Sequence, residues 1–182
     1  MIYFKGAKAD SIEYKYNIDV LTKSFPSDEY RDLKELKYYN KQKDNFICYT
    51  IISARNNIGI IHYWDFKAFI YIEHFAIEEK FRNQKLGTKV IQEFIQKVKK
   101  NIVLEVELPK DELSQKRVEF YTRLGFNLHY NKYVQPPYKS GSKSLEMKLM
   151  TYGDIDILKK FPKIVKTIYK EVYNQDIINI PQ

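Results

Sequence analysis

The chain has 182 residues, of which 44% are hydrophobic and 30% are charged. This balance is typical of a folded globular protein and excludes an intrinsically disordered chain. The formal net charge of +8 favours an anionic partner, such as a nucleotide cofactor, an acidic substrate or a nucleic acid. The 23 acidic residues are interspersed with the basic ones, which weakens the nucleic-acid interpretation.

Cysteine content and hydropathy indicate whether the protein is secreted, membrane-bound or soluble. Cys48 is the only cysteine, so neither a disulfide within the chain nor a cysteine-based metal site is possible. Residues 1–16 lack the apolar core of a signal peptide. No apolar run approaches the ~20 residues that a membrane helix needs. We therefore expect a soluble cytoplasmic protein with no membrane partner.

The first forty residues are predicted to hold one short strand and then helices. The strand falls within residues 1–16, and residues 17–24 form a weak helical piece. Ser27 is a plausible N-cap, with Asp28 and Glu29 favourable in the first turn of a helix that ends near Tyr39.

Three strands are predicted next. Segments 46–54 and 58–64 are apolar and are joined by the turn residues Arg55-Asn56-Asn57, as in a hairpin. Segment 69–77 is aromatic and apolar and has the composition of a third strand.

The basic segment Arg82–Thr88, RNQKLGT, leads from the strand 69–77 into a helix with an apolar stripe. The first N–H groups of a helix have no partner within it, and the helix dipole adds positive potential there. Arg82, Lys85 and Lys89 add full charges. This pattern predicts a binding site for a phosphate or pyrophosphate, and the alternative is an ordinary turn with solvated charges.

The second half of the chain alternates strands and helices. A strand over 102–108 precedes a helix that ends near Leu124, where Gly125 is the expected stop. Strands are predicted over 126–133 and 144–150. Residues 157–172 have helical apolar spacing, interrupted by Pro162, which predicts a terminal helix packed on the domain.

Two motifs resemble the GNAT superfamily of acyl-CoA-dependent N-acetyltransferases. Arg82 and Gly87 match the first and last positions of its pyrophosphate loop, whereas Lys85 stands where the middle glycine is usual. A lysine there can still offer its N–H if its φ need not be positive. Segment 117–126, RVEFYTRLGF, is similar to a second motif of the family. The resemblance covers roughly residues 46–150.

The resemblance implies an α/β (α+β) fold with a central mixed, mostly antiparallel sheet of six to seven strands, flanked by helices. We expect residues 1–150 to form the acetyltransferase domain and residues 151–182 a helical extension packed on it. The implied activity is acetyl transfer from acetyl-CoA to a primary amine, by direct attack within a ternary complex and without a metal. The acceptor is a small molecule, a peptide or a protein, and the protein is a monomer or homodimer.

The resemblance also implies which residues bind the co-substrate. The pyrophosphate loop consists of Arg82, Asn83, Gln84, Lys85, Leu86, Gly87 and Thr88. The backbone of Phe75, Ala76 and Ile77 is expected to meet the pantetheine arm, and Phe120 belongs to the second motif. Arg117 and Arg123 lie on the same helix as Phe120, where they reach either CoA phosphates or solvated ion-pair partners.

Acyl transfer to an amine needs a group that accepts a proton and a group that protonates the leaving thiolate. Tyr121 matches the family tyrosine that protonates the sulfur, and its alternative role is that of a core aromatic. We predict Glu73 as the base, with His74 as second choice and Glu105 and Glu107 as third; water is a further alternative. The other role of Glu73 is a salt bridge to a lysine, and that of His74 is structural. Strict strand alternation places Glu73 and His74 on opposite faces.

The acceptor side is predicted from two segments. Phe25 and Glu29 lie in the early helical region that flanks the acceptor in the family. Tyr133, Gln135 and Tyr138 belong to a Pro-Pro loop that either shapes the acceptor pocket or is an ordinary turn. Two other functions compete: a non-catalytic acyl-CoA-binding regulatory protein with the same fold, and a basic nucleic-acid-binding protein, which lacks a recognised motif.

Overall fold

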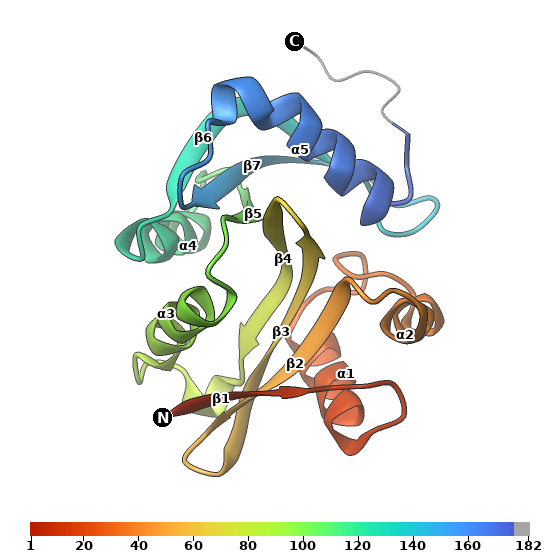
Figure 1. Cartoon of the computed structure of the whole chain (residues 1–182), viewed down its shortest axis with the longest axis vertical. Coiled ribbons are helices and arrows are strands. Elements are labelled where there is room, and N and C mark those ends of the chain that lie inside the picture. Colours follow the sequence, from red (N-terminus) through yellow and green to blue (C-terminus); the bar gives the residue numbers. More distant parts are fainter. Residues whose placement is uncertain (177–182) are drawn as a thin grey trace. The chain divides into compact units, whose positions relative to one another are not determined.

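The computed structural model describes residues 1–176, and these residues form seven strands, five α-helices and one short 3-10 helix (Figure 1). The fold class is mixed α/β, as the sequence predicts. The chain divides into two compact units, residues 1–100 and the chain from Asn101 onward, and each is described by itself. The predicted domain boundary at residue 150 stays a prediction.

The first unit is an antiparallel meander with helices on both faces. Each strand pairs with the next one in the chain. The strands are β1 (Ile2–Gly6), β2 (Phe46–Ser53), β3 (Asn56–Phe66) and β4 (Phe69–Ile77). The helices are α1 (Ile12–Ser24), α2 (Leu33–Gln42), the 3-10 helix η1 (Glu79–Phe81) and α3 (Leu86–Val98).

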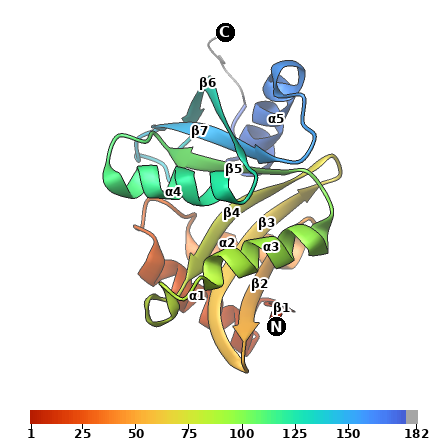
Figure 2. The ribbon, with the colours of Figure 1, turned by 90° about the vertical axis from the view of Figure 1, so that its left-hand side faces the viewer.

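Aromatic side chains fill the core on both faces of this meander. Phe94 of α3 contacts Phe4 and Tyr63, with ring centroids 5.8 and 5.1 Å apart. The next residue of β3, Trp64, faces the other way and meets Tyr39 of α2 at 5.8 Å. Period-2 alternation along β3 therefore places α3 on one face and α1 and α2 on the other (Figure 2).

The second unit has its last strand in the middle. β7 (Leu145–Tyr152) pairs antiparallel with both β5 (Ile102–Glu107) and β6 (Asn127–Gln135). Helix α4 (Glu112–Arg123) starts in a capping box between Asp111 and Ser114. As predicted, α4 ends before Gly125, whose φ of +89° is the left-handed conformation that favours glycine.

Three helix predictions need correction. Helix α2 starts at Leu33 with Asp32 as its N-cap, so the prediction that Ser27 caps this helix is wrong. Helix α1 starts at Ile12, earlier than residue 17. Pro162 does not interrupt α5 (Ile157–Glu171), which continues through it. No helix within residues 1–176 is long and apolar enough to cross a membrane.

Candidate active site

Strand β4 carries a β-bulge at Glu73. His62 of β3 lies opposite His74, and the next residue, Tyr63, lies opposite Ile72, so Glu73 has no partner in the register. A bulge bends the strand and redirects the side chains around it. The strict alternation predicted for this strand is therefore wrong at Glu73.

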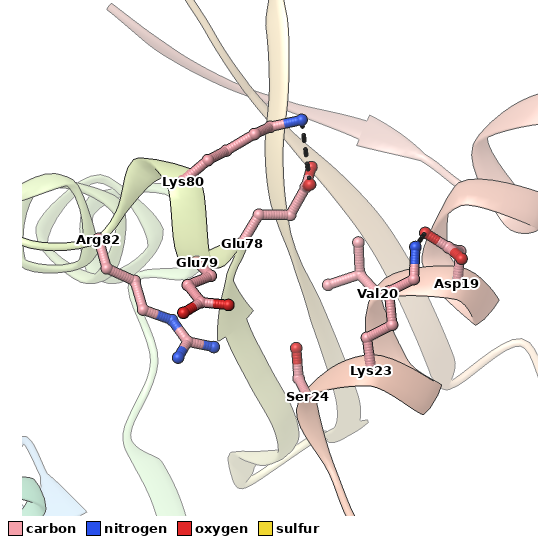
Figure 3. Close-up of a pocket in the computed structure, with 8 residues that line it drawn as sticks. All are labelled: Asp19, Val20, Lys23, Ser24, Glu78, Glu79, Lys80 and Arg82. Carbon is pink, nitrogen blue, oxygen red and sulfur yellow. Dashed lines mark hydrogen bonds and ion pairs between the residues drawn. The ribbon is translucent and has the colours of Figure 1, made fainter.

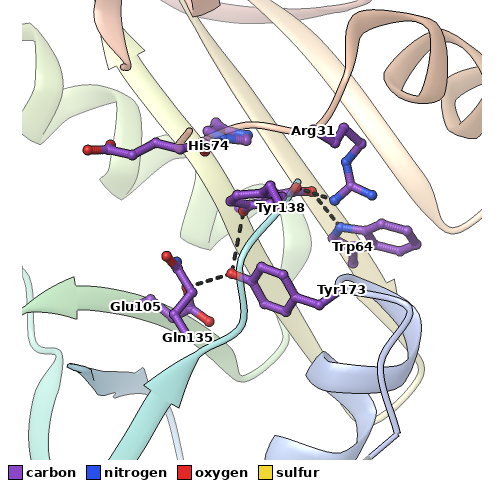
Figure 4. A network of polar contacts seen from close by, with 9 residues as sticks. Arg31, Trp64, His74, Glu105, Gln135, Tyr138 and Tyr173 are labelled. Atoms are coloured by element: carbon purple, nitrogen blue, oxygen red, sulfur yellow. Dashed lines mark hydrogen bonds and ion pairs between the residues drawn. The ribbon is translucent and has the colours of Figure 1, made fainter. Parts of the chain in front are cut away.

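The Glu73 carboxylate is held in a buried ion pair. Its Oε1 accepts from the Arg31 guanidinium, and its Oε2 accepts from the Trp64 Nε1–H at 2.7 Å (Figure 4). The exposed fractions of the Arg31 and Glu73 side chains are 2% and 0%. Burial is the largest single influence and would raise the pKa of Glu73, but the Arg31 charge, the neighbouring His74 and the hydrogen bonds from Arg31 and Trp64 together hold that pKa below its ordinary value.

His74, the next residue, holds the connection between α1 and α2. Its Nε2–H donates to the Glu29 carbonyl oxygen at 3.0 Å, and its ring meets that of Phe25 edge-on at 4.9 Å. Burial lowers the pKa of His74 below 6.5, so the imidazole is neutral at neutral pH. The structure thus brings Phe25 and Glu29, both predicted for the acceptor side, onto a predicted catalytic residue.

The predicted phosphate loop forms the start of α3. The first helical hydrogen bond runs from the Lys89 N–H to the Lys85 carbonyl, so the N–H groups of the residues between them have no acceptor within the helix. No side chain caps this end of α3, and its first turn holds no acidic residue. Lys85 has a φ of +56° and Asn83 a φ of +61°. The lysine therefore adopts the left-handed conformation that glycine adopts most easily.

A pocket of about 540 Å³ lies beside this loop, between α1 and the chain that follows β4 (Figure 3). Its lining carries both signs of charge and consists of Asp19, Val20, Lys23, Ser24, Glu78, Glu79, Lys80 and Arg82. The Arg82 Nε–H donates to the Ile77 carbonyl at 3.0 Å, so the loop arginine is tied to the end of β4.

Tyr121 is buried in the second unit, with its ring packed against Phe120 and Phe126 at centroid distances of 5.0 and 5.3 Å. Burial raises the pKa of Tyr121 to about 12, so the phenol keeps its proton at neutral pH. Two arginines on the same helix have acidic partners. Arg117 pairs with Glu107, and Arg123 pairs with Glu119 at 3.5 Å. Their predicted contact with CoA stays a prediction.

Glu105, which the sequence analysis ranked only third among the candidate bases, is the centre of a hydrogen-bond network around the predicted Pro-Pro loop. Glu105 accepts hydrogen bonds from the Tyr133 hydroxyl and the Gln135 amide. It also accepts one from the Tyr173 hydroxyl at 2.8 Å (Figure 4). The Tyr138 ring packs on that of Tyr173 at 4.9 Å. Tyr133 and Gln135 lie on β6 and not in the predicted loop, and together with Tyr138 they share one network. Sequence reasoning missed Tyr173, because its partner Glu105 lies 68 positions away in the chain and no local pattern around residue 173 indicates that contact.

The residues predicted for the site thus fall into groups. In the first unit, one group surrounds Glu73 and His74, and the other is the loop at the start of α3. In the second unit, one group surrounds Tyr121 and the other surrounds Glu105. Within residues 1–176, no group of three or more His, Cys, Asp or Glu side chains could hold a metal ion.

Comparisons with known proteins place this geometry in a family. Residues 14–126 match the model of the acetyltransferase (GNAT) family. A solved structure from Bacteroides thetaiotaomicron, assigned to the GNAT family as an acetyltransferase, is 37% identical with a TM-score of 0.93. The alignment covers 96% of this chain and 99% of that one. A comparison with curated proteins found no match.

More distant structures share the fold alone. A GNAT acetyltransferase from Elizabethkingia anophelis with acetyl-CoA bound is 20% identical, has a TM-score of 0.58, and aligns over 84% of this chain and 98% of its own. The ribosomal-protein-S18-alanine N-acetyltransferase from Escherichia coli is 15% identical, has a TM-score of 0.55, and aligns over 84% and 93%. From the family match and the 37% identical structure, we conclude that this chain belongs to the GNAT family of acetyltransferases.

Proposed function

We propose that the protein transfers the acetyl group of acetyl-CoA to a primary amine, by direct attack within a ternary complex. The observation that carries the proposal is the uncapped N-terminus of α3, which begins directly after a basic loop. Family membership supports acetyl transfer in general, and the free N–H groups of this helix end support our assignment of the anionic co-substrate to it.

The loop fits the pyrophosphate of CoA. Helix α3 offers N–H groups at Leu86, Gly87 and Thr88 that no helical carbonyl accepts. The helix dipole and the lysines at 85 and 89 favour an anion at that point. Two neighbours support a CoA co-substrate in general, because structures from Bacillus subtilis and Elizabethkingia anophelis with this fold hold CoA and acetyl-CoA. We place the pantetheine arm along the backbone of Phe75–Ile77, which leads towards the loop.

In the proposed reaction the neutral amine attacks the thioester carbonyl carbon, a C–N bond forms, and the C–S bond breaks. Tyr121 then donates its phenolic proton to the departing thiolate. A phenol with a pKa of about 12 is fully protonated at neutral pH, and this is the state that a general acid needs. The tyrosine regains its proton from the solvent.

The amine must lose a proton, and its free pKa is near ~10.4. Glu73 and His74 are the two candidates on β4. The Glu73 carboxylate already accepts hydrogen bonds from Arg31 and Trp64, which weakens it as a base. His74 is neutral and is therefore in the right protonation state. We keep both as proposed bases, because Glu73→Gln removes one of them and leaves the other, so the pH–rate profile of that variant tells them apart.

The acceptor class is left to experiment, because the neighbours name different amines. One acts on an alanine of a ribosomal protein and another on spermidine. We propose a screen with four probe amines: 1,4-diaminobutane, tyramine, alanine amide and the peptide Ala-Lys-Ala. Thiol release from acetyl-CoA reports turnover. Release that depends on one of these amines supports the proposal, and release equal to the amine-free blank with all four counts against it.

The CoA loop is tested separately by Gly87→Val. A β-branched residue here crowds the close approach of a phosphate to the helix backbone, so CoA binding is expected to weaken by about 10-fold or more. Gly6→Val is the matched control, because it makes the same substitution on β1, where an added Cβ meets no atom within 4 Å. Calorimetry on folded Gly87→Val that finds wild-type CoA affinity would remove this loop from the site.

A further inference from the structure

Three contacts hold the α1–α2 connection, residues 25–32, on strand β4. The Phe25 ring meets His74, the Glu29 carbonyl accepts from His74, and the Arg31 guanidinium pairs with Glu73. Two consecutive residues of β4, Glu73 and His74, therefore receive all three contacts, and Glu73 is the bulge residue.

Arg31 is the charged member of this set, and it lies among aromatic rings. Its guanidinium carbon is 4.6 Å from the ring centroid of Tyr39 and 5.6 Å from that of Trp64. A buried ion pair is weak evidence for stability, since well-packed apolar residues often stabilise a fold as well or better. Such a pair does fix one geometry, because each charge is costly to bury without its partner.

We propose that Arg31 is a positioning residue, which clamps the connection 25–32 onto the Glu73 bulge and so fixes the acceptor side of the site. The inference rests on the proposed function, in which Phe25 and Glu29 face the acceptor and the backbone after the bulge meets the pantetheine arm. The clamp joins the segment that binds one substrate to the strand that binds the other.

The contact between Arg31 and Glu73 can be followed in a pH–rate profile, because the pKa of Glu73 depends on the charged groups around it. The titratable and charged groups that act on it are Arg31 from the connection, His74 on β4, His62 on β3, Tyr39 on α2 and Cys48 on β2. Burial raises the pKa values of Tyr39 and Cys48 and lowers those of both histidines, so all four are neutral at neutral pH. Arg31 is then the one positive charge in this set, and its removal lets burial raise the pKa of Glu73.

The test compares Arg31→Met with the double variant Arg31→Met/Glu73→Gln, in which no buried charge is left without its partner. Lys37→Met is the control, because Lys37 pairs with Asp10 on the surface. Trp64 is the only tryptophan, so its fluorescence reports whether the cluster stays folded. Amide hydrogen exchange over residues 25–32 reports the clamp, and the KM values for acetyl-CoA and for the fastest probe amine report its consequence.

In the folded double variant we expect faster exchange over residues 25–32 and an amine KM raised about 10-fold or more, with the acetyl-CoA KM within about twofold of wild type. In Arg31→Met the acid limb of the pH–rate profile should move to higher pH. Wild-type exchange and wild-type amine KM in the double variant would overturn the clamp. A rise in acetyl-CoA KM alone would overturn it too. Absence of turnover in the wild type would instead refute the proposed function, while hydrogen exchange still decides the clamp.

Discussion

Lys85 combines a strained backbone with a predicted phosphate contact, and two substitutions separate these properties. Its φ and ψ are +56° and +14°, and Lys99 at the other end of α3 has +48° and +39°. Both side chains are exposed, so replacing either removes little packing. The left-handed conformation costs an L-residue about 1–2 kcal/mol, and the entropy of glycine in the unfolded chain offsets about 0.5–1 kcal/mol of the relief.

Lys85→Gly and Lys99→Gly should therefore each raise the free energy of unfolding by about 0.5–1 kcal/mol. For a chain of this size that corresponds to an increase in Tm of roughly 1–4 °C. Lys85→Ala keeps the strained backbone and removes only the charge, so its stability should stay near that of the wild type. Calorimetric unfolding of the three variants measures these differences.

CoA affinity should group these variants differently from stability, because it depends on the Lys85 charge and not on the backbone conformation. An exposed ionic contact contributes about 0.2–1 kcal/mol, which is a loss of roughly 1.4- to 5-fold in Kd. Lys85→Gly and Lys85→Ala should both show this loss and a weaker salt dependence, while Lys99→Gly should bind as the wild type does. If Lys85→Gly binds CoA with unchanged salt dependence, the lysine charge does not meet a phosphate and that part of the reasoning fails.

Three further predictions concern the buried titratable groups. Tyr121→Phe should lower kcat by about 10²–10⁴-fold at nearly unchanged CoA affinity if the phenol protonates the thiolate; wild-type kcat would return Tyr121 to a core aromatic. In Glu73→Gln, the acid limb should disappear if Glu73 is the base, whereas a limb that persists below pH 6.5 in this variant assigns the role to His74. Burial lowers the pKa of His62 to about 3, so the unfolded chain binds more protons below pH 6.5. Stability should therefore decrease as the pH is lowered from 6.5 towards 3, by up to about 1.4 kcal/mol per pH unit, and His62→Gln should flatten that slope in denaturant titrations.

Local patterns in the sequence were sufficient where local physics decides the structure. The strand Phe69–Ile77 has the predicted bounds, because its aromatic and β-branched residues favour a pleated sheet. The stop at Gly125 follows from a positive φ that glycine alone adopts without strain. The basic loop before α3 was recognisable from its charges and its place between a strand and a helix.

The sequence failed where a distant partner decides the structure. Asp28 and Glu29 suit a first helical turn, yet the chain stays non-helical through Arg31 and α2 starts only at Leu33, and Arg31 is paired with Glu73. That pairing joins residues 42 positions apart, and no local pattern encodes it. The bulge at Glu73 has no sequence signal either, because a bulge is defined by register with the neighbouring strand. At Lys85 the family glycine is missing, and its positive φ was identified only in the structure.

The central claim is that the protein moves an acetyl group from acetyl-CoA to an amine. The most direct measurement incubates wild-type protein, acetyl-CoA and each probe amine, and quantifies free thiol together with acetylated amine by mass spectrometry. We predict equal amounts of both products, in proportion to enzyme concentration, for at least one amine. Tight acetyl-CoA binding with no amine-dependent thiol release from any of the four probes would contradict the claim and favour a non-catalytic acyl-CoA-binding protein.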